Sequence, residues 1–568
     1  MKLLWVLCFL GCSWSSLWAL DREAFRFTRY DLEVRVDPDN QVLAARGKIV
    51  LRNDSAQPQT NATLQISSSL SWRLIESGGK PLQHLDQNYP SDIDHTGAVT
   101  EAVVTLPGAV PVGGSVELEV GYSGAIKQDA TRLTEIGVPD ATATASDWDQ
   151  ISKDFTVLRG VGHVAWYPLS ISAARLAENT LFPALGRWQM RQAQADMRMR
   201  LCWISDQEQP PTLIANGHFE GMGGKTEGEI TKTRCSDYRF APLGTTIPTF
   251  TIGNWEVLNR PNITIYHTPD HKNVAADYAL AAEKQAPFIT DWFGAASEKV
   301  QVIELPDVHD EPFETGAMIF TPLRRGEPKS LELMMAHQLT HAAFHSPRLW
   351  IAEGVAHFAQ ALVRENQEGR KAALSYMSAR LPALVELEKQ SPAESTDNAL
   401  IASNDEVFYR VKAAYVWWML RDMIGDTTLR DALRAYRPDQ DKAPGYLQQL
   451  LQTHTKRDLE SFFDDWVYRD RGLPDFRITS VFPRETLNGG YVVAVTVENT
   501  SAAGAEVPLT LRTASGERET RLQVPGKQKA VTRIQTSEMP VEAVVNDGSV
   551  PEADESNNTF KLEPKATQ

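Results

Sequence analysis

Apolar and polar positions alternate along much of the first 265 residues, which is the pattern of half-buried β-strands. The alternation is clearest over residues 32–36, 116–122 and 197–201, and turn-forming residues interrupt it repeatedly. Short strands with frequent turns predict a large antiparallel β domain over residues 20–265. Residues 126–160 lack this periodicity, so we expect a loop insertion there.

After residue 265 the spacing of apolar residues changes to three or four, which predicts helices. An Ala-rich run over residues 273–293 has this spacing, whereas residues 299–305 are typical of a strand. Further helical runs follow at residues 372–388, 407–424, 428–436, 446–451 and 459–468. We therefore expect residues 266–477 to form a mostly helical domain.

The last part of the chain, residues 478–568, returns to a β pattern. Residues 491–497, 509–513 and 530–534 are rich in β-prone side chains and are separated by turns. This spacing predicts a small immunoglobulin-like β-sandwich. Its acidic stretch at residues 546–555 fits no EF-hand spacing and is typical of a solvated loop.

The first 19 residues have the pattern of a secretory signal peptide. A lysine at position 2 precedes an apolar run over residues 3–10, and small residues follow. We expect a secreted or periplasmic protein without a transmembrane segment in the mature chain. An alternative is a lipoprotein signal, in which Cys12 is acylated and anchors the chain to lipid.

The overall composition restricts the partners and the redox state. A net charge of −16 argues against nucleic acid and anionic membranes as partners. Outside the signal, Cys202 and Cys235 are an even pair, which in an oxidising compartment predicts a disulfide. Two buried thiols are the alternative. Zinc binding by this pair is disfavoured, because no second Cys or His pair has a suitable spacing.

The strongest chemical signal lies between residues 331 and 362. His337 and His341 are four residues apart, so on a helix both imidazoles leave the same face. Pro347 breaks the helix, and Glu353 follows on a second apolar run. If the two helices pack antiparallel, all three side chains lie at similar depth and can hold one zinc ion. A pair of histidines alone is weak evidence, since buried histidines are usually core residues with hydrogen bonds.

The surrounding residues resemble those of a known family. Residues 350–356, Trp-Ile-Ala-Glu-Gly-Val-Ala, are similar to the W-L-N-E-G-F-A segment of the aminopeptidase N family of zinc peptidases. Residues 337–341 resemble its H-E-x-x-H motif, and residues 314–320 resemble the region of its G-A-M-E-N motif. Residues 458–474 resemble the segment that closes its helical part. The likeness covers most of residues 25–477.

This resemblance implies a gluzincin-type architecture. The expected parts are a saddle-like antiparallel β domain, a thermolysin-like zinc catalytic domain with a helical bundle, and a terminal β-sandwich. The implied metal ligands are His337, His341 and Glu353, with His345 and His357 as spare candidates. A strand carrying Gly316, Ala317 and Met318 is expected to pair with a peptide substrate, and the alternative is an ordinary edge strand.

One motif position departs from the family at the centre of the mechanism. The general base of the family is the glutamate after the first histidine, and Gln338 stands there instead. An amide has no basic atom that can take a proton from water. The connection from His341 to Glu353 is also shorter than in the family, with only residues 342–352 between them. Glu314 is a candidate substitute base.

Two further positions depart from the family. Ile319 stands where the family has the glutamate that holds the free amino terminus of the substrate. The transition-state tyrosine of the family, aligned on Lys412, falls on Arg410, so Tyr409 can take that role only where the helix is locally offset.

The sequence therefore supports three hypotheses. The first is a zinc metallopeptidase of reduced activity. The second is a catalytically silent protein that binds peptides or a protein partner in the same cleft, and Gln338 favours it. The third is a scaffold without metal, which the three intact ligand positions disfavour.

Overall fold

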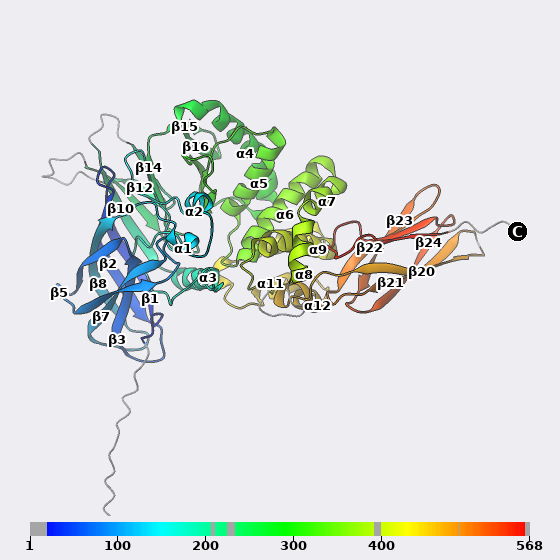
Figure 1. The fold of residues 1–568 in the computed structure, drawn as a ribbon, viewed down its shortest axis with the longest axis horizontal. Helices are drawn as coiled ribbons and strands as arrows, with labels where there is room; N and C mark the ends of the chain where they lie inside the picture. The colour runs from blue at the N-terminus through cyan, green and yellow to red at the C-terminus, as the bar shows by residue number, and fades with distance from the viewer. Residues whose placement is uncertain (1–19, 206–210, 224–232, 391–398, 488, 563–568) are drawn as a thin grey trace, which may run out of the picture.

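The computed structural model describes residues 20–205, 211–223, 233–390, 399–487 and 489–562. The predicted signal peptide and Cys12 lie outside these residues. The described chain is a mixed α+β protein with β-sheets at both ends and helices between them (Figure 1). The expected α+β class is confirmed. Among the described helices, none is both long and apolar enough to cross a bilayer.

The N-terminal part is built on an eight-stranded sheet with the order β12-β13-β10-β1-β2-β8-β4-β5. Its strands are β1 (Phe25–Asp37), β2 (Val42–Asn53), β4 (Leu70–Ser77), β5 (Lys80–Pro81), β8 (Ser115–Ala125), β10 (Asp196–Ile204), β12 (His218–Gly223) and β13 (Thr233–Phe240). The predicted strands at 32–36, 116–122 and 197–201 are parts of β1, β8 and β10. β1 pairs in parallel with β10, whereas its other neighbour, β2, is antiparallel. The expectation of antiparallel pairing is wrong at this ladder, because an alternating sequence does not encode strand direction.

Two smaller sheets complete the N-terminal part. One consists of β3 (Gln59–Ser67), β7 (Ala98–Val110) and β6 (His84–Pro90), and the other of β11 (Thr212–Ala215), β14 (Phe250–Gly253) and β9 (Phe155–Leu158). The segment 126–160 is not the loop insertion that its weak periodicity predicts. It contains β9 and two short helices, α1 (Thr131–Thr134) and α2 (Asp140–Ser146). These helices are held by buried ion pairs rather than by an apolar stripe: Arg132 binds Asp147, and Arg159 binds Asp149.

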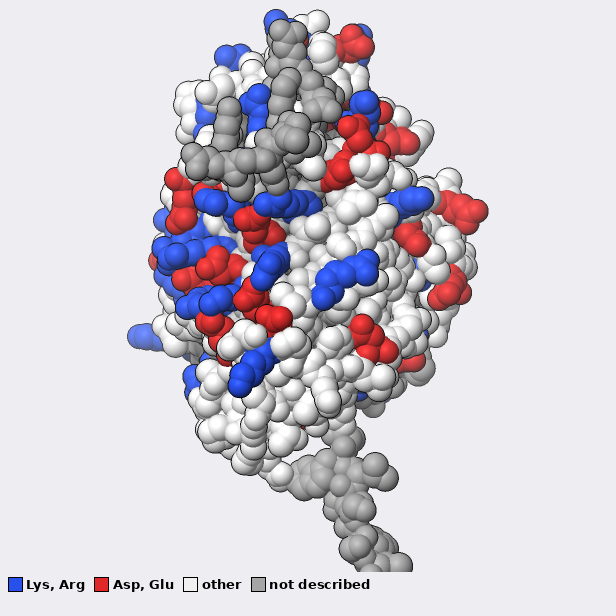
Figure 2. Space-filling view, turned by 90° about the vertical axis from the view of Figure 1, so that its left-hand side faces the viewer, with Lys and Arg blue, Asp and Glu red and all other residues white. Residues whose placement is uncertain are grey.

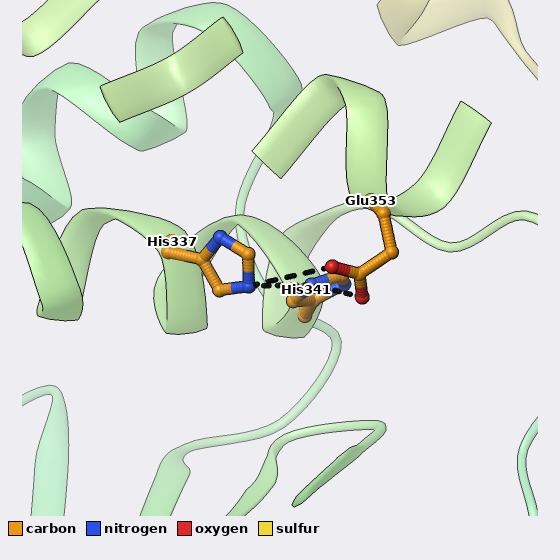
Figure 3. A group of neighbouring side chains, drawn as sticks. All are labelled: His337, His341 and Glu353. Atoms are coloured by element: carbon orange, nitrogen blue, oxygen red, sulfur yellow. Dashed lines mark hydrogen bonds and ion pairs between the residues drawn. The ribbon is translucent and has the colours of Figure 1, made fainter. Parts of the chain in front are cut away.

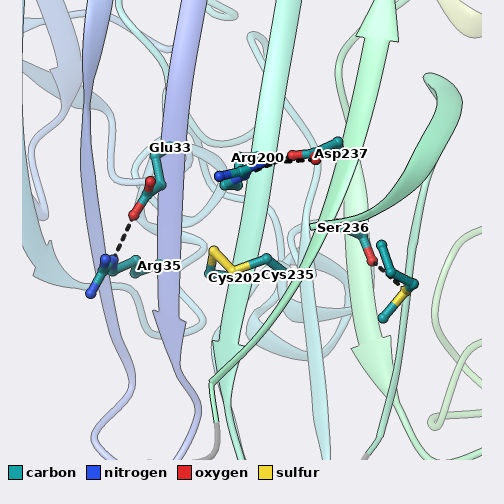
Figure 4. The surroundings of a disulfide bond; sticks show 8 residues. Glu33, Arg35, Arg200, Cys202, Cys235, Ser236 and Asp237 are labelled. Carbon is teal, nitrogen blue, oxygen red and sulfur yellow. Dashed lines mark hydrogen bonds and ion pairs between the residues drawn. A yellow bond between two sulfur atoms is a disulfide. The ribbon is translucent and has the colours of Figure 1, made fainter. Parts of the chain in front are cut away.

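The outer face of the large sheet carries mixed charges. Figure 2, which views the molecule from this end, shows Lys and Arg side chains interspersed with Asp and Glu. Several are cross-strand pairs, such as Arg46 with Glu119 and Arg200 with Asp237. The same sheet holds the disulfide between Cys202 on β10 and Cys235 on β13 (Figure 4). The two cysteines are register partners with Cα atoms 4.0 Å apart, and the predicted pairing is confirmed.

A five-stranded sheet begins the middle part. Its order is β15 (Glu256–Asn259), β16 (Ile263–His267), β17 (Val300–Glu304), β19 (Met318–Thr321) and β18 (Phe313–Thr315). The predicted helix at 273–293 is α4 (Lys272–Phe293), which packs on this sheet. The sheet begins ahead of residue 266, where the sequence places the start of this part. Because β18 is the edge strand, residues 316–318 do not form the free edge that a peptide would extend.

Helices make up the rest of the middle part. They are α5 (Pro328–Ala343), α6 (Leu349–Glu368), α7 (Arg370–Ser378), α8 (Leu381–Gln390), α9 (Ala413–Ile424), α10 (Asp426–Ala435), α11 (Tyr446–His454) and α12 (Glu460–Phe463), with π-helical turns η2 (Val407–Lys412) and η4 (Asp464–Tyr468). The single helix predicted at 372–388 is divided into α7 and α8. Pro382 explains the division, since a proline has no N–H to bond the carbonyl four residues before it, at Ser378, where α7 ends.

The C-terminal part consists of two facing sheets. One contains β20 (Phe476–Glu485), β21 (Tyr491–Asn499) and β24 (Lys529–Thr536), and the other contains β23 (Glu517–Val524), β22 (Ala505–Arg512), β25 (Glu542–Val545) and β26 (Thr559–Lys561). Valines and leucines of both sheets are buried in the core that also includes the helices. Trp466 of η4 is fully buried and donates a hydrogen bond of 2.8 Å to the Gly504 carbonyl, which ties the sheets to the helices.

Candidate metal centre

Two adjoining helices position the strongest candidate site. Pro328 occupies the first turn of α5, where a proline costs no helical hydrogen bond. The helix then carries His337 and His341 on one face, one turn apart. A short connection follows, and α6 presents Glu353 near its start. Figure 3 shows both imidazoles from one helix and the carboxylate from the other pointing toward a common centre. The expected helix–turn–helix arrangement is therefore present.

The distances within this group fit a single metal ion. The Nε2 atoms of His337 and His341 are 3.1 Å apart, and His341 Nε2 lies 3.2 Å from Glu353 Oε1. His337 Nε2 lies 3.9 Å from Glu353 Oε2. Zinc bonds of about 2.0–2.2 Å at a tetrahedral centre place the ligand atoms roughly 3.3 Å apart. One ligand atom from each residue lies within 4.8 Å of the others.

The hydrogen bonding of the group also supports a metal site. Glu353 Oε2, which faces His337 Nε2, is buried without a hydrogen-bond partner in the described chain. Buried polar atoms normally have partners, so an unpaired carboxylate oxygen at this point is consistent with a bound cation. The side chains of His337, His341 and Glu353 are 19%, 13% and 17% exposed, which leaves access from the cleft.

The three groups also perturb one another electrostatically. Burial alone would raise the pKa of Glu353, but His341 and then His337 hold that pKa well below its usual range. Burial, and then the neighbouring His341, lower the pKa of His337. Burial would lower the pKa of His341, but Glu353 raises it. These shifts favour an ionised Glu353 and a neutral His337, the forms in which a carboxylate and an imidazole bind a metal ion.

The spare histidines lie nearby without joining the group. His357 Nε2 is 4.0 Å from Glu353 Oε2, and its ring centroid is 4.8 Å from that of His337. Its Nδ1 lies 2.9 Å from Gln360 Oε1, which orients the ring. His345 stands in the α5–α6 connection and lines the adjacent cavity. Burial lowers the pKa of each to about 4, so both are neutral at physiological pH.

Gln338 is buried beside the group. It is 1% exposed, and neither polar atom of its amide has a hydrogen-bond partner in the described part of the chain. Glu314 lies close enough to respond to this amide. Burial, with a smaller contribution from the charge of Glu353, raises the pKa of Glu314 to about 7. His341 and the Gln338 amide both oppose this rise in pKa.

The predicted tyrosine position lies in the π-helical turn η2. A π-helical turn accommodates one extra residue and so offsets the helix locally at Tyr409, whose catalytic role stays a prediction. Both Tyr409 and Arg410 lie near Glu353: Arg410 Nε is 3.3 Å from Glu353 Oε2, and its guanidinium is 5.7 Å from the Tyr409 ring. Burial raises the pKa of Tyr409 to about 12. Lys412, in contrast, is fully buried and pairs with Glu388 and Asp470.

Arg410 is a neighbour of the site to which the sequence assigns no role. The sequence does place it there, since alignment on Lys412 puts Arg410 in the tyrosine position. Its cationic side chain could not be assigned a target before the fold brought η2 against α6.

Residues 314–320 form a hairpin rather than one strand. Gly316 has a φ of +59° and, with Ala317, makes the turn between β18 and β19. Of the three residues expected on one strand, only Met318 lies in a strand, β19. Gly316 lines the cavity beside the metal group, whereas Ala317 and Met318 line a cavity behind the hairpin. Ile319 is fully buried in the core and is not exposed to the cleft.

Two adjoining cavities form the cleft. The smaller, of about 290 Å³, is lined by His341, His345, Glu353 and Glu314 among others. The larger, of about 920 Å³, lies where α3 (Leu181–Gln192) meets the α5–α6 connection. They share Gln189, Ile247, Pro312, Phe313, Ser346 and Ala352. A chain of several residues therefore has room to extend past the metal group.

Known structures share this architecture. A crystal structure of an M1 zinc metallopeptidase from Deinococcus radiodurans matches with a TM-score of 0.54 and 15% identity, over 78% of this chain and 94% of that one. A mutant of that enzyme, bound to a Tyr-Ser-Ala substrate, matches with a TM-score of 0.53 and 16% identity over 78% and 94% of the two chains. The chain has the fold of M1 zinc metallopeptidases.

A two-domain M1 mutant bound to L-arginine also matches, with a TM-score of 0.50 and 16% identity over 76% of this chain and 91% of that chain. No protein-family model matches the sequence, and no curated protein matches it. The resemblance seen in the sequence motifs is thus supported at the level of the fold.

Proposed function

We propose that this protein is an M1-like zinc metallopeptidase that acts on or binds peptides, with hydrolysis impaired because Gln338 replaces the general-base glutamate. The observation that carries this proposal is the convergence of His337, His341 and Glu353 at metal-ligand distances, on the wall of a cleft. The peptide-bound structural neighbour supports peptides as the ligand class.

In this proposal the three side chains hold one zinc ion. Zinc, when bound, polarises the scissile carbonyl and lowers the pKa of its water to about 7. Gln338 can position a water molecule by hydrogen bonding but cannot accept its proton. The loss of a general base costs about 10²–10⁴ in rate.

Two other side chains, next to each other in η2 and with Arg410 in contact with Glu353, carry hydrogen-bond donors. The Tyr409 hydroxyl stays protonated at neutral pH, because its pKa is raised to about 12. The Arg410 guanidinium contacts Glu353 and stays charged. Both can stabilise negative charge that develops on a carbonyl oxygen. Glu353 is thereby oriented from one side by Arg410 and from the other by His341.

The finer architecture and location belong to the same proposal. We assign residues 20–265 to a saddle-like domain, residues 266–477 to a thermolysin-like catalytic domain and residues 478–568 to an immunoglobulin-like sandwich. The signal-like residues 1–19 and the disulfide support a secreted or periplasmic location. Acylation of Cys12 is the alternative for the amino terminus.

A second function is a catalytically silent peptide- or protein-binding scaffold in the same cleft. The buried amide of Gln338 favours it, because that position offers no proton acceptor. Both functions predict zinc, and they differ in turnover.

Metal analysis combined with a broad peptide-cleavage assay on the mature protein tests both functions. We expect nearly one zinc per chain, a sharp loss in His341→Ala and no loss in His454→Ala, whose histidine is exposed on α11. Slow, zinc-dependent cleavage supports the peptidase, and peptide binding without cleavage supports the scaffold. A protein without zinc after growth in zinc would contradict both.

A further inference from the structure

Glu314 is the second carboxylate of the catalytic cleft. Among the residues that line the cavity of about 290 Å³, the acidic ones are Glu314 and Glu353. Glu353 belongs to the candidate metal ligands. Glu314 is on the edge strand β18, across the cavity from α6, and is only partly buried. It is therefore the carboxylate on this cavity wall that is free to serve another purpose.

The strand register fixes the side of the hairpin on which Glu314 stands. Glu314 is paired directly with Ile319 of β19. Side chains of directly paired residues project from the same face of a sheet. Ile319 is buried in the core that includes Met335 and Leu339 of α5. Glu314 thus projects toward α5, the helix that carries His337, Gln338 and His341.

The surroundings of Glu314 match this placement. Glu314, His341 and Glu353 all line the cavity of about 290 Å³, and Gln338 lies on α5 between the two candidate histidine ligands. Gln338 itself has no atom that accepts a proton at neutral pH. Hydrolysis at this site needs an acceptor within reach of a water molecule in the cavity. A carboxylate facing the same space from β18 meets that need.

We propose that Glu314 is the proton acceptor for the residual hydrolysis; this inference rests on the proposed function. As the water oxygen forms a bond to the scissile carbonyl carbon, one water proton passes to the Glu314 carboxylate. The same proton then moves to the leaving nitrogen as the carbon–nitrogen bond breaks. The products are a carboxylic acid and an amine, and Glu314 returns to its ionised form.

The test is a set of variants in two backgrounds. In the unmutated background, Glu314→Gln should lower kcat by about 10²-fold or more, the scale of general-base catalysis. Glu327→Gln, which changes an exposed carboxylate just before α5, should leave kcat unchanged. In the Gln338→Glu background, position 338 supplies a base again, so Glu314→Gln should lose most of its effect. Zinc content and affinity for an uncleavable peptide should be the same in all variants.

The outcomes separate this inference from the proposed function. A protein that binds zinc and cleaves peptides equally well with Glu314→Gln overturns the role of Glu314 and leaves the peptidase standing. A protein that binds zinc and peptide but never cleaves also overturns it, and leaves the scaffold standing. A loss of zinc or of peptide affinity in Glu314→Gln would assign Glu314 to binding and contradict the inference. A protein without zinc and without cleavage contradicts the proposed function itself.

Discussion

Replacement of Gln338 by glutamate is the most direct test of the site. The change Gln338→Glu exchanges an amide for a carboxylate of nearly the same shape at a position that is 1% exposed. It restores a proton acceptor next to His337. Because no hydrogen bond of the amide is broken, the fold should tolerate the change. We expect zinc content and secondary structure to stay unchanged.

The magnitude follows from the chemistry of general bases and from the local charges. A positioned base contributes about 10²–10⁴ in rate, or roughly 3–5 kcal/mol of barrier. Burial raises the pKa of the neighbouring Glu314 to about 7, and burial at position 338 would likewise disfavour the ionised form of the new carboxylate. Measured at pH 8, where the ionised form is favoured more than at pH 7, kcat should rise by at least about 10²-fold.

The assay is cleavage of a peptide mixture by the zinc-loaded protein, with Gln449→Glu as the matched control. Gln449 is exposed on α11, so the same chemical change there should leave kcat unaltered. If the zinc-loaded Gln338→Glu protein remains inactive, the loss of activity extends beyond one residue. Arg410 in place of the tyrosine and the short α5–α6 connection would then explain it, and the binding function would become the better conclusion.

Three further predictions follow from other parts of the structure. Acetylation of the amino terminus of a peptide should not weaken its binding or cleavage, because Ile319 is buried and apolar where the family has a glutamate. A strong preference for peptides with a free amino terminus would contradict this prediction and assign Glu314 to binding the terminal ammonium group. Removal of zinc by a chelator should lower Tm, since a ligand at about 1,000 times its Kd stabilises the folded state by about 4 kcal/mol. A protein that contains no metal before treatment and whose Tm the chelator leaves unchanged would argue for a metal-free scaffold. Burial, and then Arg159, lower the pKa of His163 from 6.5 to about 4. As pH falls, the unfolded chain therefore protonates His163 before the folded chain does, and stability is lost between about pH 6.5 and about pH 4, by up to roughly 3 kcal/mol. In denaturant unfolding, the free energy of unfolding of His163→Gln should differ less between pH 7 and pH 5 than that of the unmutated protein.

The ligand group was accessible from the sequence because it depends on local periodicity. His337 and His341 are one helical turn apart, and Pro347 forces the return that brings Glu353 alongside. These are short-range constraints, and the distances of 3.1 and 3.2 Å confirm the arrangement they predict. The roles of the three residues stay predictions until metal is measured.

Features that depend on long-range pairing could not be read in the same way. Glu314 faces α5 because of its register with Ile319, and the sequence of 314–320 alone is equally consistent with one continuous strand. The parallel ladder between β1 and β10 joins segments separated by most of the N-terminal part. The α1–α2 segment is held by buried ion pairs, such as that between Arg132 and Asp147, and these leave no apolar periodicity.

The short α5–α6 connection is in contact with the N-terminal part of the chain. Only residues 344–348 separate the two helices, and α3 contacts this connection at Pro347. A side-chain carbon at Gly186 of α3 would lie 2.7 Å from the Pro347 carbonyl oxygen, so only glycine permits this approach. The larger cavity lies at this contact, so α3 forms part of the wall of the cleft.

The energetic cost of the ligand group bears on the choice between a metal site and a metal-free scaffold. Burial disfavours the charged form of Glu353, His337 and His341 alike, and the pKa values of Glu353 and His341 are shifted the other way only by their charged neighbours. Groups buried in this way destabilise a fold unless charge or hydrogen bonds compensate them, and apolar residues of similar size would be less costly. Arg410 compensates Glu353 only in part, since its contact with Oε2 leaves that atom without a hydrogen bond. A divalent cation at the common centre compensates all three at once, which is why we favour a metal site over a scaffold that never binds metal.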